Sequence, residues 1–543
     1  MGDRGALWVL LGAMMASAAT LLRLSRGSTL FSDELRMFGA SARVDFPEWI
    51  EPWNGHLQIT SRVIYKTLFE TFGANYLAVR ALNVFMVLVA AGVFFALVRR
   101  RVGAVAALAP TLLLLFLGSS WTILLSGFGT TATFTIATGL AALLAIERDD
   151  VRGDVAACVL ITLSVASFSI GLAFLTGLIV AVLLRPTRWR AAWVFLIPLT
   201  LYVAWWVWAR QFHDDLSSGA NALLVPFWIL ESIAADAGSL LGVNLQVHLR
   251  TAQNLDTTTW ARAAAIAFLI ALALRVRQGG LPRSFWVSVT VALGYWTLIG
   301  YVGSADAVRV PGAPRYIYPG AVVLLLVATD ALRGVALSSR ALAVLFGVTA
   351  FGLIGNVALL RAGGEYFRGY SSQIGTDLAM IEVASASVPH DLVPALARVD
   401  GEPLIDAGTY LTAVGRFGSP ARTLAEVRKE PAWIREAADV ELGRIYRPTL
   451  STTRGRGSHC TRIDAAPGQP VTFAIPPGST AKIRIPPGPP AGVGLRRFGD
   501  RFSVGAGKLS PETMAALSLP ADAAPDPWRA EVQVSTLTVC RDR

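Results

Sequence analysis

Long apolar runs separated by short polar stretches fill the first two thirds of the chain. A membrane-crossing helix needs roughly 20 apolar residues, and two shorter helices can share one long run. On that basis we expect eleven spans, and the chain is predicted to be a polytopic α-helical membrane protein. The spans lie near residues 6–24, 76–98, 102–118, 130–146, 154–168, 170–184, 191–209, 260–275, 284–302, 317–333 and 341–360.

Arginine-rich segments indicate how these spans are oriented. Clusters of arginine fall at 99–101, 185–190, 275–283 and 333–340, and the eleven-span count places all four on one side. By the positive-inside rule that side is the cytoplasm, so the amino end is also inside. The segments expected outside are 25–75, 119–129, 210–259, 303–316 and 361–543.

Two features of this count depend only on charge parity, that is, on the requirement that all four arginine clusters fall on the same side of the membrane. The run 154–184 must form two short helices that turn near Ser167–Gly171, and the apolar stretch 221–243 must lie at the membrane surface without crossing. The start of the chain, with Arg4 and Ala16–Ala18 on either side of an apolar run, also resembles a signal peptide. We expect it to stay as the first span, because a multi-span protein needs no cleaved signal.

The pattern changes after residue 360. A mixed helical segment (361–454) is followed by a part rich in Pro and Gly, in which runs such as Val471–Ile475 alternate at the period of a strand. We predict a small β-sandwich over 455–543, beside a transmembrane domain over 1–360. Cys460 and Cys540 lie in this last part, and outside the cytoplasm they can form a disulfide.

Composition supports the membrane class. Apolar residues make up 54% of the chain and charged residues only 16%, where soluble domains carry about a quarter; the mean hydropathy is +0.52. The net charge of +11 does not indicate nucleic-acid binding, because the arginines stand at the ends of apolar runs. A bias toward Ala, Arg and Gly is compatible with a high-GC genome, such as that of an actinobacterium.

The first outside segment holds the most informative residues. Asp33 and Glu34 follow the first span closely, and an aromatic stretch with Trp49 and Trp53 leads to His56. From residue 57 to 72 the apolar positions recur on one face of a helix, which predicts an amphipathic helix on the membrane surface. Adjacent acids in an outside loop are often only solvated. The aromatic stretch, His56 and the amphipathic helix that follow this pair favour a catalytic role for it.

This arrangement resembles the GT-C membrane glycosyltransferases, a group that includes protein O-mannosyltransferases and bacterial aminoarabinose transferases. The shared features are the acids soon after the first helix, the aromatic loop, and the histidine that opens an interfacial helix. Where those relatives often read His-Pro-Pro, this chain reads His56-Leu57-Gln58. Arg315-Tyr316, at the outer start of a late helix, is similar to another patch of the group. The resemblance covers roughly residues 1–360.

The resemblance implies an inverting sugar transfer from a polyprenyl-phosphate donor, in the plasma (inner) membrane and on its outer face. Asp33 is then the general base and Glu34 a supporting acid, or the two roles are exchanged. The donor phosphate is expected to meet cationic and hydroxyl groups, namely Arg315, Tyr316, Tyr318 and His56. Further side chains that can line the cavity are Arg62, Lys66, Asp306 and Arg309. The sugar and the acceptor, which can be a glycan, a lipid or a protein, stay open.

Several other interpretations compete with this one. His56 can simply cap an interfacial helix, and Arg62 and Lys66 can extend toward the membrane surface as long cations do. His213-Asp214-Asp215 resembles a metal cluster, but no second histidine-rich group accompanies it, so no metal or other cofactor is predicted. A transporter or flippase of lipid-linked glycans would show paired charges within spans and repeated halves, and a non-catalytic scaffold is also open.

Overall fold

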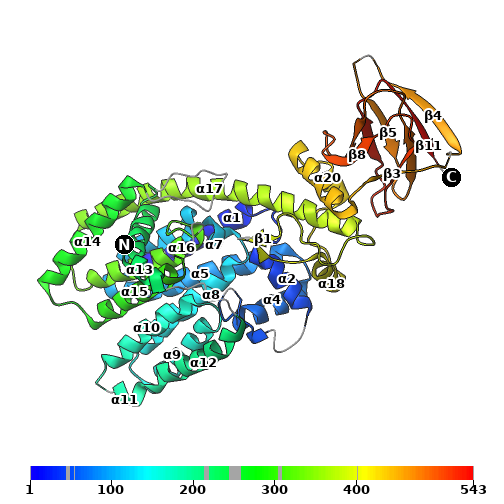
Figure 1. Cartoon of the computed structure of the whole chain (residues 1–543). Coiled ribbons are helices and arrows are strands. Elements are labelled where there is room, and N and C mark those ends of the chain that lie inside the picture. The colour runs from blue at the N-terminus through cyan, green and yellow to red at the C-terminus, as the bar shows by residue number, and fades with distance from the viewer. Residues whose placement is uncertain are drawn as a thin grey trace. The chain divides into compact units, whose positions relative to one another are not determined.

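The chain forms two compact units in the computed structural model, and Figure 1 colours them along the sequence. The first unit consists of Met1–Gly27, Arg43–Thr71 and Leu77–Arg368. The second consists of Ser28–Ala42, Phe72–Tyr76 and Gly369–Arg543. The structure describes residues 2–43, 49–53, 55–186, 188–212, 219–243, 258–303, 309–399, 402–455, 457–466 and 468–541.

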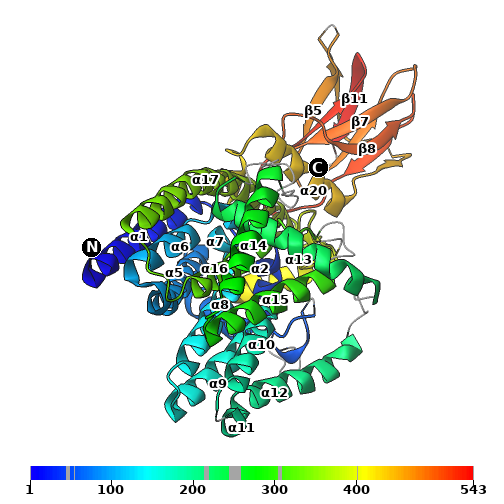
Figure 2. The same ribbon diagram turned by 90° about the vertical axis from the view of Figure 1, so that its left-hand side faces the viewer.

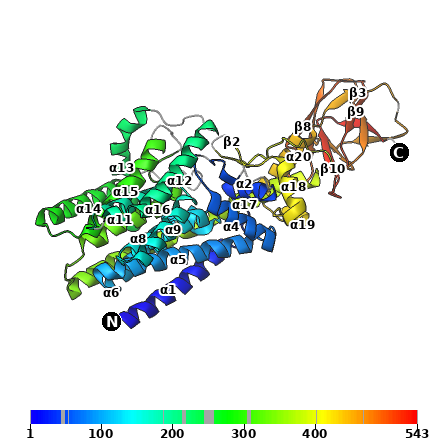
Figure 3. The same ribbon diagram turned by 90° about the horizontal axis from the view of Figure 1, so that it is seen from below.

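The first unit is helical, as the long apolar runs predict. Figure 3 shows many of its helices running side by side. Its helices are α1 (Asp3–Leu24), α4 (Ile59–Phe72), α5 (Tyr76–Val102), α6 (Ala104–Leu115), η1 (Gly118–Ser120), α7 (Trp121–Leu125), α8 (Gly129–Ile146), α9 (Val151–Val165), α10 (Ile170–Leu183), α11 (Arg188–Ala191), α12 (Trp193–Ala209), η2 (Arg210–Phe212), α13 (Gly219–Leu240), α14 (Thr259–Gln278), α15 (Arg283–Gly303), α16 (Pro314–Ala331) and α17 (Ser339–Val383), whose last part belongs to the second unit.

Eight helices of the described residues are long and apolar enough to cross a membrane, or nine if the bent pair of α6 and η1–α7 is one span. Each of the eleven predicted spans coincides with a helix or with this bent pair. Three of them, α9, α10 and α16, are shorter or less apolar than the eight, and one of the eight, α13, was not predicted to cross. The chain is a multi-pass membrane protein, while the full count of eleven stays a prediction.

The run 154–184 forms two helices, as charge parity required. Helix α9 ends at Val165 and α10 begins at Ile170. A Cβ at Gly171 would stand 2.5 Å from the main chain of Ser164, so only glycine fits where the two helices turn back on each other. The predicted turn at Ser167–Gly171 is confirmed.

Helix α13 meets α15 near the end of α15. The Asn221 side chain donates to the carbonyl of Tyr301 at 2.9 Å, and Trp228 lies against Gly300 and Gly303. About one and a half turns earlier on α15, Trp296 donates to Asp236, which lies fifteen residues after Asn221 on α13. Helix α13 is also long and apolar enough to cross a membrane, so the non-crossing placement of 221–243 at the membrane surface stays a prediction.

A buried charge network joins the ends of α5, α8 and α16 to the start of α15. The side chains of Arg101 on α5 and Asp330 on α16 form an ion pair and are 3% and 0% exposed. Ser284 and Ser288 of α15 donate to the same carboxylate, and Glu147, after α8, lies 3.7 Å from Arg101. Such a pair tolerates burial only when its remaining polar atoms are satisfied. The predicted basic cluster at 99–101 therefore also ties helices together.

The described residues of the second unit form an antiparallel pair, β1-β2, and two larger antiparallel sheets, several strands of which are visible in Figure 2. The orders are β3-β9-β6-β11-β4 and β5-β10-β7-β8. Buried and exposed residues alternate along β5 and β10, so one face of that sheet is covered, as the strand pattern predicted. The strands are β1 (Arg398–Val399), β2 (Glu402–Pro403), β3 (Leu450–Thr452), β4 (His459–Asp464), β5 (Val471–Ile475), β6 (Thr480–Arg484), β7 (Ala491–Arg496), β8 (Val504–Leu509), β9 (Ala515–Ser518), β10 (Trp528–Val532) and β11 (Thr536–Arg541).

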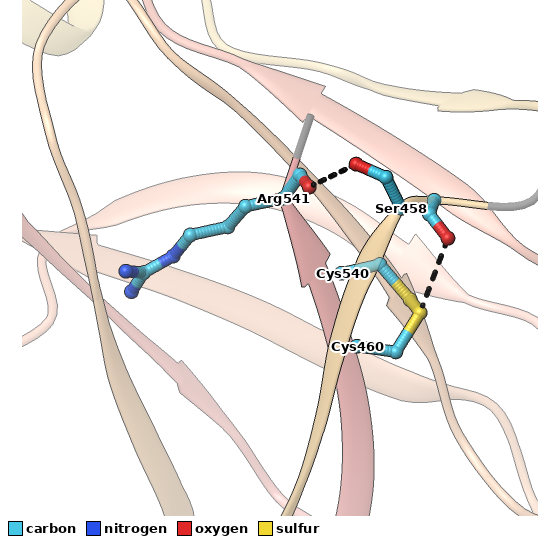
Figure 4. The surroundings of a disulfide bond; sticks show 5 residues. Ser458, Cys460, Cys540 and Arg541 are labelled. Carbon is cyan, nitrogen blue, oxygen red and sulfur yellow. Dashed lines mark hydrogen bonds between the residues drawn. A yellow bond between two sulfur atoms is a disulfide. The ribbon is translucent and has the colours of Figure 1, made fainter. Parts of the chain in front are cut away.

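A disulfide joins Cys460 and Cys540, as the sequence predicted. The two cysteines lie directly opposite each other on β4 and β11. In Figure 4, Ser458 donates to the carbonyl of Arg541 beside this bond, at 3.2 Å. The remaining cysteine, Cys158, is free and buried.

Four further helices belong to the second unit: α2 (Asp33–Ala42), α18 (Ala407–Phe417), α19 (Leu424–Val427) and α20 (Ala432–Tyr446). The carboxylate of Asp439 on α20 accepts three main-chain N–H groups of the turn after β7, from Arg497, Phe498 and Gly499. This fixes α20 to the sheets. The sequence-based division placed 28–42 with residues 1–360, whereas in the structure α2 packs on α18.

Candidate active site

The acid pair Asp33–Glu34 opens α2, and its two members differ in exposure. Glu34 is 0% exposed, and its Oε2 accepts the main-chain N–H of Phe31 at 3.0 Å. Asp33 is half-buried and is preceded by Ser32 at a φ of 51°. A non-glycine residue with positive φ is strained, and such strain gathers at functional positions. The helix start also favours negative charge, so it can stabilise both carboxylates.

Packing within the second unit fixes α2 in place. The Phe38 ring contacts the rings of Tyr410 and Phe417 on α18. A Cβ at Gly39 would stand 2.7 Å from the Thr409 side chain, so the two helices approach closely at this glycine. Just before α2, the hydroxyl of Thr29 donates to the carbonyl of Pro420 at 2.8 Å. Contacts with residues almost 400 positions away therefore hold the acid pair.

His56 closes a tight turn in the first unit. Trp53 and His56 exchange two main-chain hydrogen bonds, at 3.0 and 2.8 Å, and Gly55 between them has a φ of 76°. The imidazole Nδ1 lies 2.6 Å from the hydroxyl of Ser169, and the centre of its ring lies 4.3 Å from that of Phe168, with the two rings tilted by 52°. The histidine thus precedes the interfacial helix α4, as predicted, and contacts the turn between α9 and α10.

An apolar cavity of about 450 Å³ lies beside this turn. Helices α9 and α12 and the loop before α4 line it, and Tyr202, whose hydroxyl interacts with Ser169, is one of the lining residues. Its other lining residues are Ile50, Leu57, Ile59, Thr162, Val165, Ala166, Pro198, Leu201, Trp205 and Trp208. An apolar cavity with a few polar groups at one side suits an amphiphilic ligand.

Arg62 and Lys66 on α4 have partners within the protein. Arg62 donates to the carbonyl of Glu51 at 3.0 Å and stands 5.8 Å from the centre of the Trp53 ring, so it supports the loop that carries His56. Lys66 pairs with Glu70 one turn later, at 3.4 Å. Both cations thus have structural contacts, and their place in the wall of a ligand cavity stays a prediction.

Arg315 stands in the first turn of α16 and is exposed. Its guanidinium lies 5.1 Å from the centre of the Tyr316 ring, and no carboxylate of the described residues forms a salt bridge with it. Tyr318, by contrast, is 0% exposed, with its hydroxyl enclosed. Tyr316 is half-buried, so it is the better placed of the two tyrosines to bind a ligand with Arg315.

The remaining predicted residues add little to the site. Arg309 lies near Gly303, the last residue of α15, and Asp306 falls outside the described residues. His213-Asp214-Asp215 also falls outside them, and the described part of the chain holds no group of three or more metal-binding side chains. Sequence reasoning missed Ser169, although the turn that contains it was recognised. It also missed Tyr295, which lies within an apolar run that gave no signal.

Comparison with known proteins finds solved structures of similar fold. No family model and no curated protein matches the chain. ArnT from Cupriavidus metallidurans in the apo state matches with 14% identity and a TM-score of 0.45, over 78% of this chain and 91% of ArnT. ArnT bound to undecaprenyl phosphate matches with 15% identity and a TM-score of 0.44, over 74% and 84%. The chain is similar to ArnT in architecture. This likeness is one of fold alone.

Proposed function

We propose that this protein transfers a sugar from a polyprenyl-phosphate donor to an acceptor hydroxyl on the outer face of the membrane. The observation that carries the proposal is the contrast between two neighbouring acids at the start of α2. Asp33 is half-buried and follows a strained residue, whereas Glu34 is buried and bonded to the main chain. The partly exposed carboxylate is our candidate for proton transfer, and the buried one holds the turn.

In this reaction the acceptor oxygen attacks the anomeric carbon and the bond from that carbon to the phosphate oxygen breaks. Asp33 takes the proton of the acceptor hydroxyl, and polyprenyl phosphate leaves with the bonding electrons, so the anomeric configuration inverts. Glu34 keeps Asp33 in position through its bond to Phe31. The transferred sugar can be a hexose or a pentose.

The phosphate and the lipid chain need different surroundings. Arg315 offers an exposed guanidinium with no carboxylate partner among the described residues, and its planar fork suits phosphate oxygens. The apolar cavity beside His56 offers space for part of a polyprenyl chain, with the imidazole and the Ser169 hydroxyl as polar neighbours. ArnT has been seen with undecaprenyl phosphate, a lipid of this class.

The test compares Asp33→Asn with Glu34→Gln and with Asp391→Asn, which alters an exposed acid elsewhere in the second unit. Purified full-length protein in lipid nanodiscs is assayed for sugar transfer from a polyprenyl-phosphate donor. Loss of a general base typically lowers the rate by 10² to 10⁴. The transfer rate of Asp33→Asn should therefore fall by about that factor, while that of Asp391→Asn stays normal. Glu34→Gln keeps an oxygen that accepts from Phe31 and should lose less.

If Asp33→Asn and Glu34→Gln each keep a near-normal transfer rate, the acid pair is ordinary loop charge. If the wild-type protein moves lipid-linked glycan between leaflets of a vesicle but forms no transfer product, the protein is a flippase.

A further inference from the structure

The first turn of α16, which carries Arg315, is held from α15 by a buried hydroxyl. Tyr295 is 1% exposed, and its hydroxyl donates to the main-chain carbonyl of Tyr316 at 2.8 Å. A helical carbonyl already accepts the N–H four residues ahead. The bond from Tyr295 is thus additional, and removing it leaves the helix its own hydrogen bonds. From the other side, Ser120 donates to the carbonyl of Pro314 at 2.9 Å.

The second turn of α16 meets a buried acid from α13. Asp236 lies so close to Gly320 that a Cβ there would stand 2.2 Å from a carboxylate oxygen. Trp296, next to Tyr295 on α15, donates its indole N–H to this carboxylate at 3.0 Å. Acidic side chains buried within a membrane bundle are costly and generally have a functional reason. Two neighbouring residues of α15 therefore secure successive turns of α16.

We infer that Tyr295, together with the Trp296–Asp236 pair, positions Arg315 for the phosphate of a polyprenyl-phosphate ligand. The inference rests on the function proposed above and adds positioning residues to it. None of the three has to touch the ligand: Tyr295 bonds to the main chain of α16, and Trp296 holds Asp236 where it packs against Gly320 of α16. A guanidinium that grips phosphate through two parallel bonds needs a fixed orientation, so a loosened first turn weakens binding without removing any group that binds.

A purely structural role for Tyr295 makes a different prediction. A hydroxyl that only stabilises the bundle affects thermal unfolding, and its effect on ligand affinity is the same whatever residue stands at position 315. A hydroxyl that positions Arg315 affects ligand affinity only while Arg315 is present, because it acts by orienting that guanidinium. A double-mutant cycle separates the two roles.

The experiment measures the Kd of undecaprenyl phosphate for full-length protein in nanodiscs, together with thermal unfolding. Tyr295→Phe keeps the buried ring and loses the hydroxyl, and losing one hydrogen bond should raise the Kd about 3- to 10-fold. In an Arg315→Lys background, which keeps a charge but not the fork, the same change should have little further effect. Tyr301→Phe, on an exposed tyrosine of the same helix, is the matched control and should bind normally.

Trp296→Phe supplies a second, independent variant, because it removes the N–H that holds Asp236, and we expect it to raise the Kd in the same direction. The inference is overturned if Tyr295→Phe binds as tightly as wild type, or if it weakens binding by the same factor with Arg315 present and in the Arg315→Lys background. Failure of the proposed function looks different: folded wild-type protein does not bind undecaprenyl phosphate, or Arg315→Lys leaves its Kd unchanged.

Discussion

At the scale of single residues, neighbours with the same chemistry have different surroundings. Asp33 is half-buried and Glu34 is fully enclosed, although they are adjacent. Arg62 supports a loop, whereas Arg315 has no salt-bridge partner among the described residues. Residue type alone does not distinguish these cases, because what separates them is burial and the groups that each side chain meets.

A prediction at this scale concerns Glu441 on α20. Its carboxyl is 1% exposed, and burial raises its pKa above the usual range, against the opposing effect of Arg444. The folded state therefore binds the proton more tightly than the unfolded state does. Its contribution to stability is complete below the unfolded pKa and is lost as the pH rises through the folded pKa.

Glu441 should therefore contribute a loss of stability to the second unit as the pH rises above about 4.5, the ordinary pKa of Glu, and Glu441→Gln should remove this contribution. Unfolding of full-length protein, followed by a probe in the sheets at several pH values, measures it. Asp526→Asn, at a carboxylate that faces Arg428, is a control that should leave the contribution of Glu441 in place. An unchanged pH dependence in Glu441→Gln would contradict the prediction.

At the scale of elements, close approach of helices depends on glycines at defined positions. Gly171 allows α9 and α10 to turn sharply, and Gly39 allows α2 to pack on α18. The second contact matters more for function, because α2 begins with the acid pair. The aromatic rings of α18 then fix the rotation of α2.

Gly39→Val should push α2 away from α18, since even a Cβ there would stand 2.7 Å from Thr409. Overpacking of this kind typically costs about 1–3 kcal/mol, and displacement of Asp33 should lower sugar transfer although no reactive group is removed. Gly415→Ala is the matched control on α18, where a Cβ meets nothing within 4 Å. That change should be neutral or slightly stabilising. Equal transfer rates in the two variants would show that the α2–α18 contact does not control the acids.

At the scale of the whole molecule, the decisive property is the topology in the membrane. The structure supplies helices for all eleven predicted spans, and the arginine clusters predict which ends face the cytoplasm. Under this topology the segments that carry Asp33, His56 and Arg315 are all outside, together with the sheets. The orientation stays a prediction.

Single cysteines at Arg190 and Thr412, both exposed in the structure, test the orientation. A membrane-impermeant thiol reagent added to intact cells should label Thr412→Cys and leave Arg190→Cys unlabelled until the membrane is opened. Background labelling should be low, because Cys158 is buried and the other two cysteines form a disulfide. Labelling of Arg190→Cys in intact cells would overturn the eleven-span topology.

The sequence by itself determined the features that depend on local pattern. Hydropathy located the helices of the bundle, the period of two located strands such as β5, and parity of charge required the hairpin of α9 and α10. The disulfide between Cys460 and Cys540 was predicted because both cysteines lie in the last part of the chain, which is expected outside the cytoplasm. The resemblance of the chain's short motifs to the GT-C enzymes also pointed to Asp33 and Arg315.

Only the tertiary structure decided which of these residues are accessible and what holds them. The burial of Glu34 and Tyr318 and the bond from Tyr295 to α16 each depend on partners that no local pattern announces. The physical reason is distance along the chain: Thr29 bonds to Pro420 across 391 positions. Hydropathy and periodicity show which environment, apolar or aqueous, each segment prefers. The positions of residues within a site depend instead on which distant segments pack against each other.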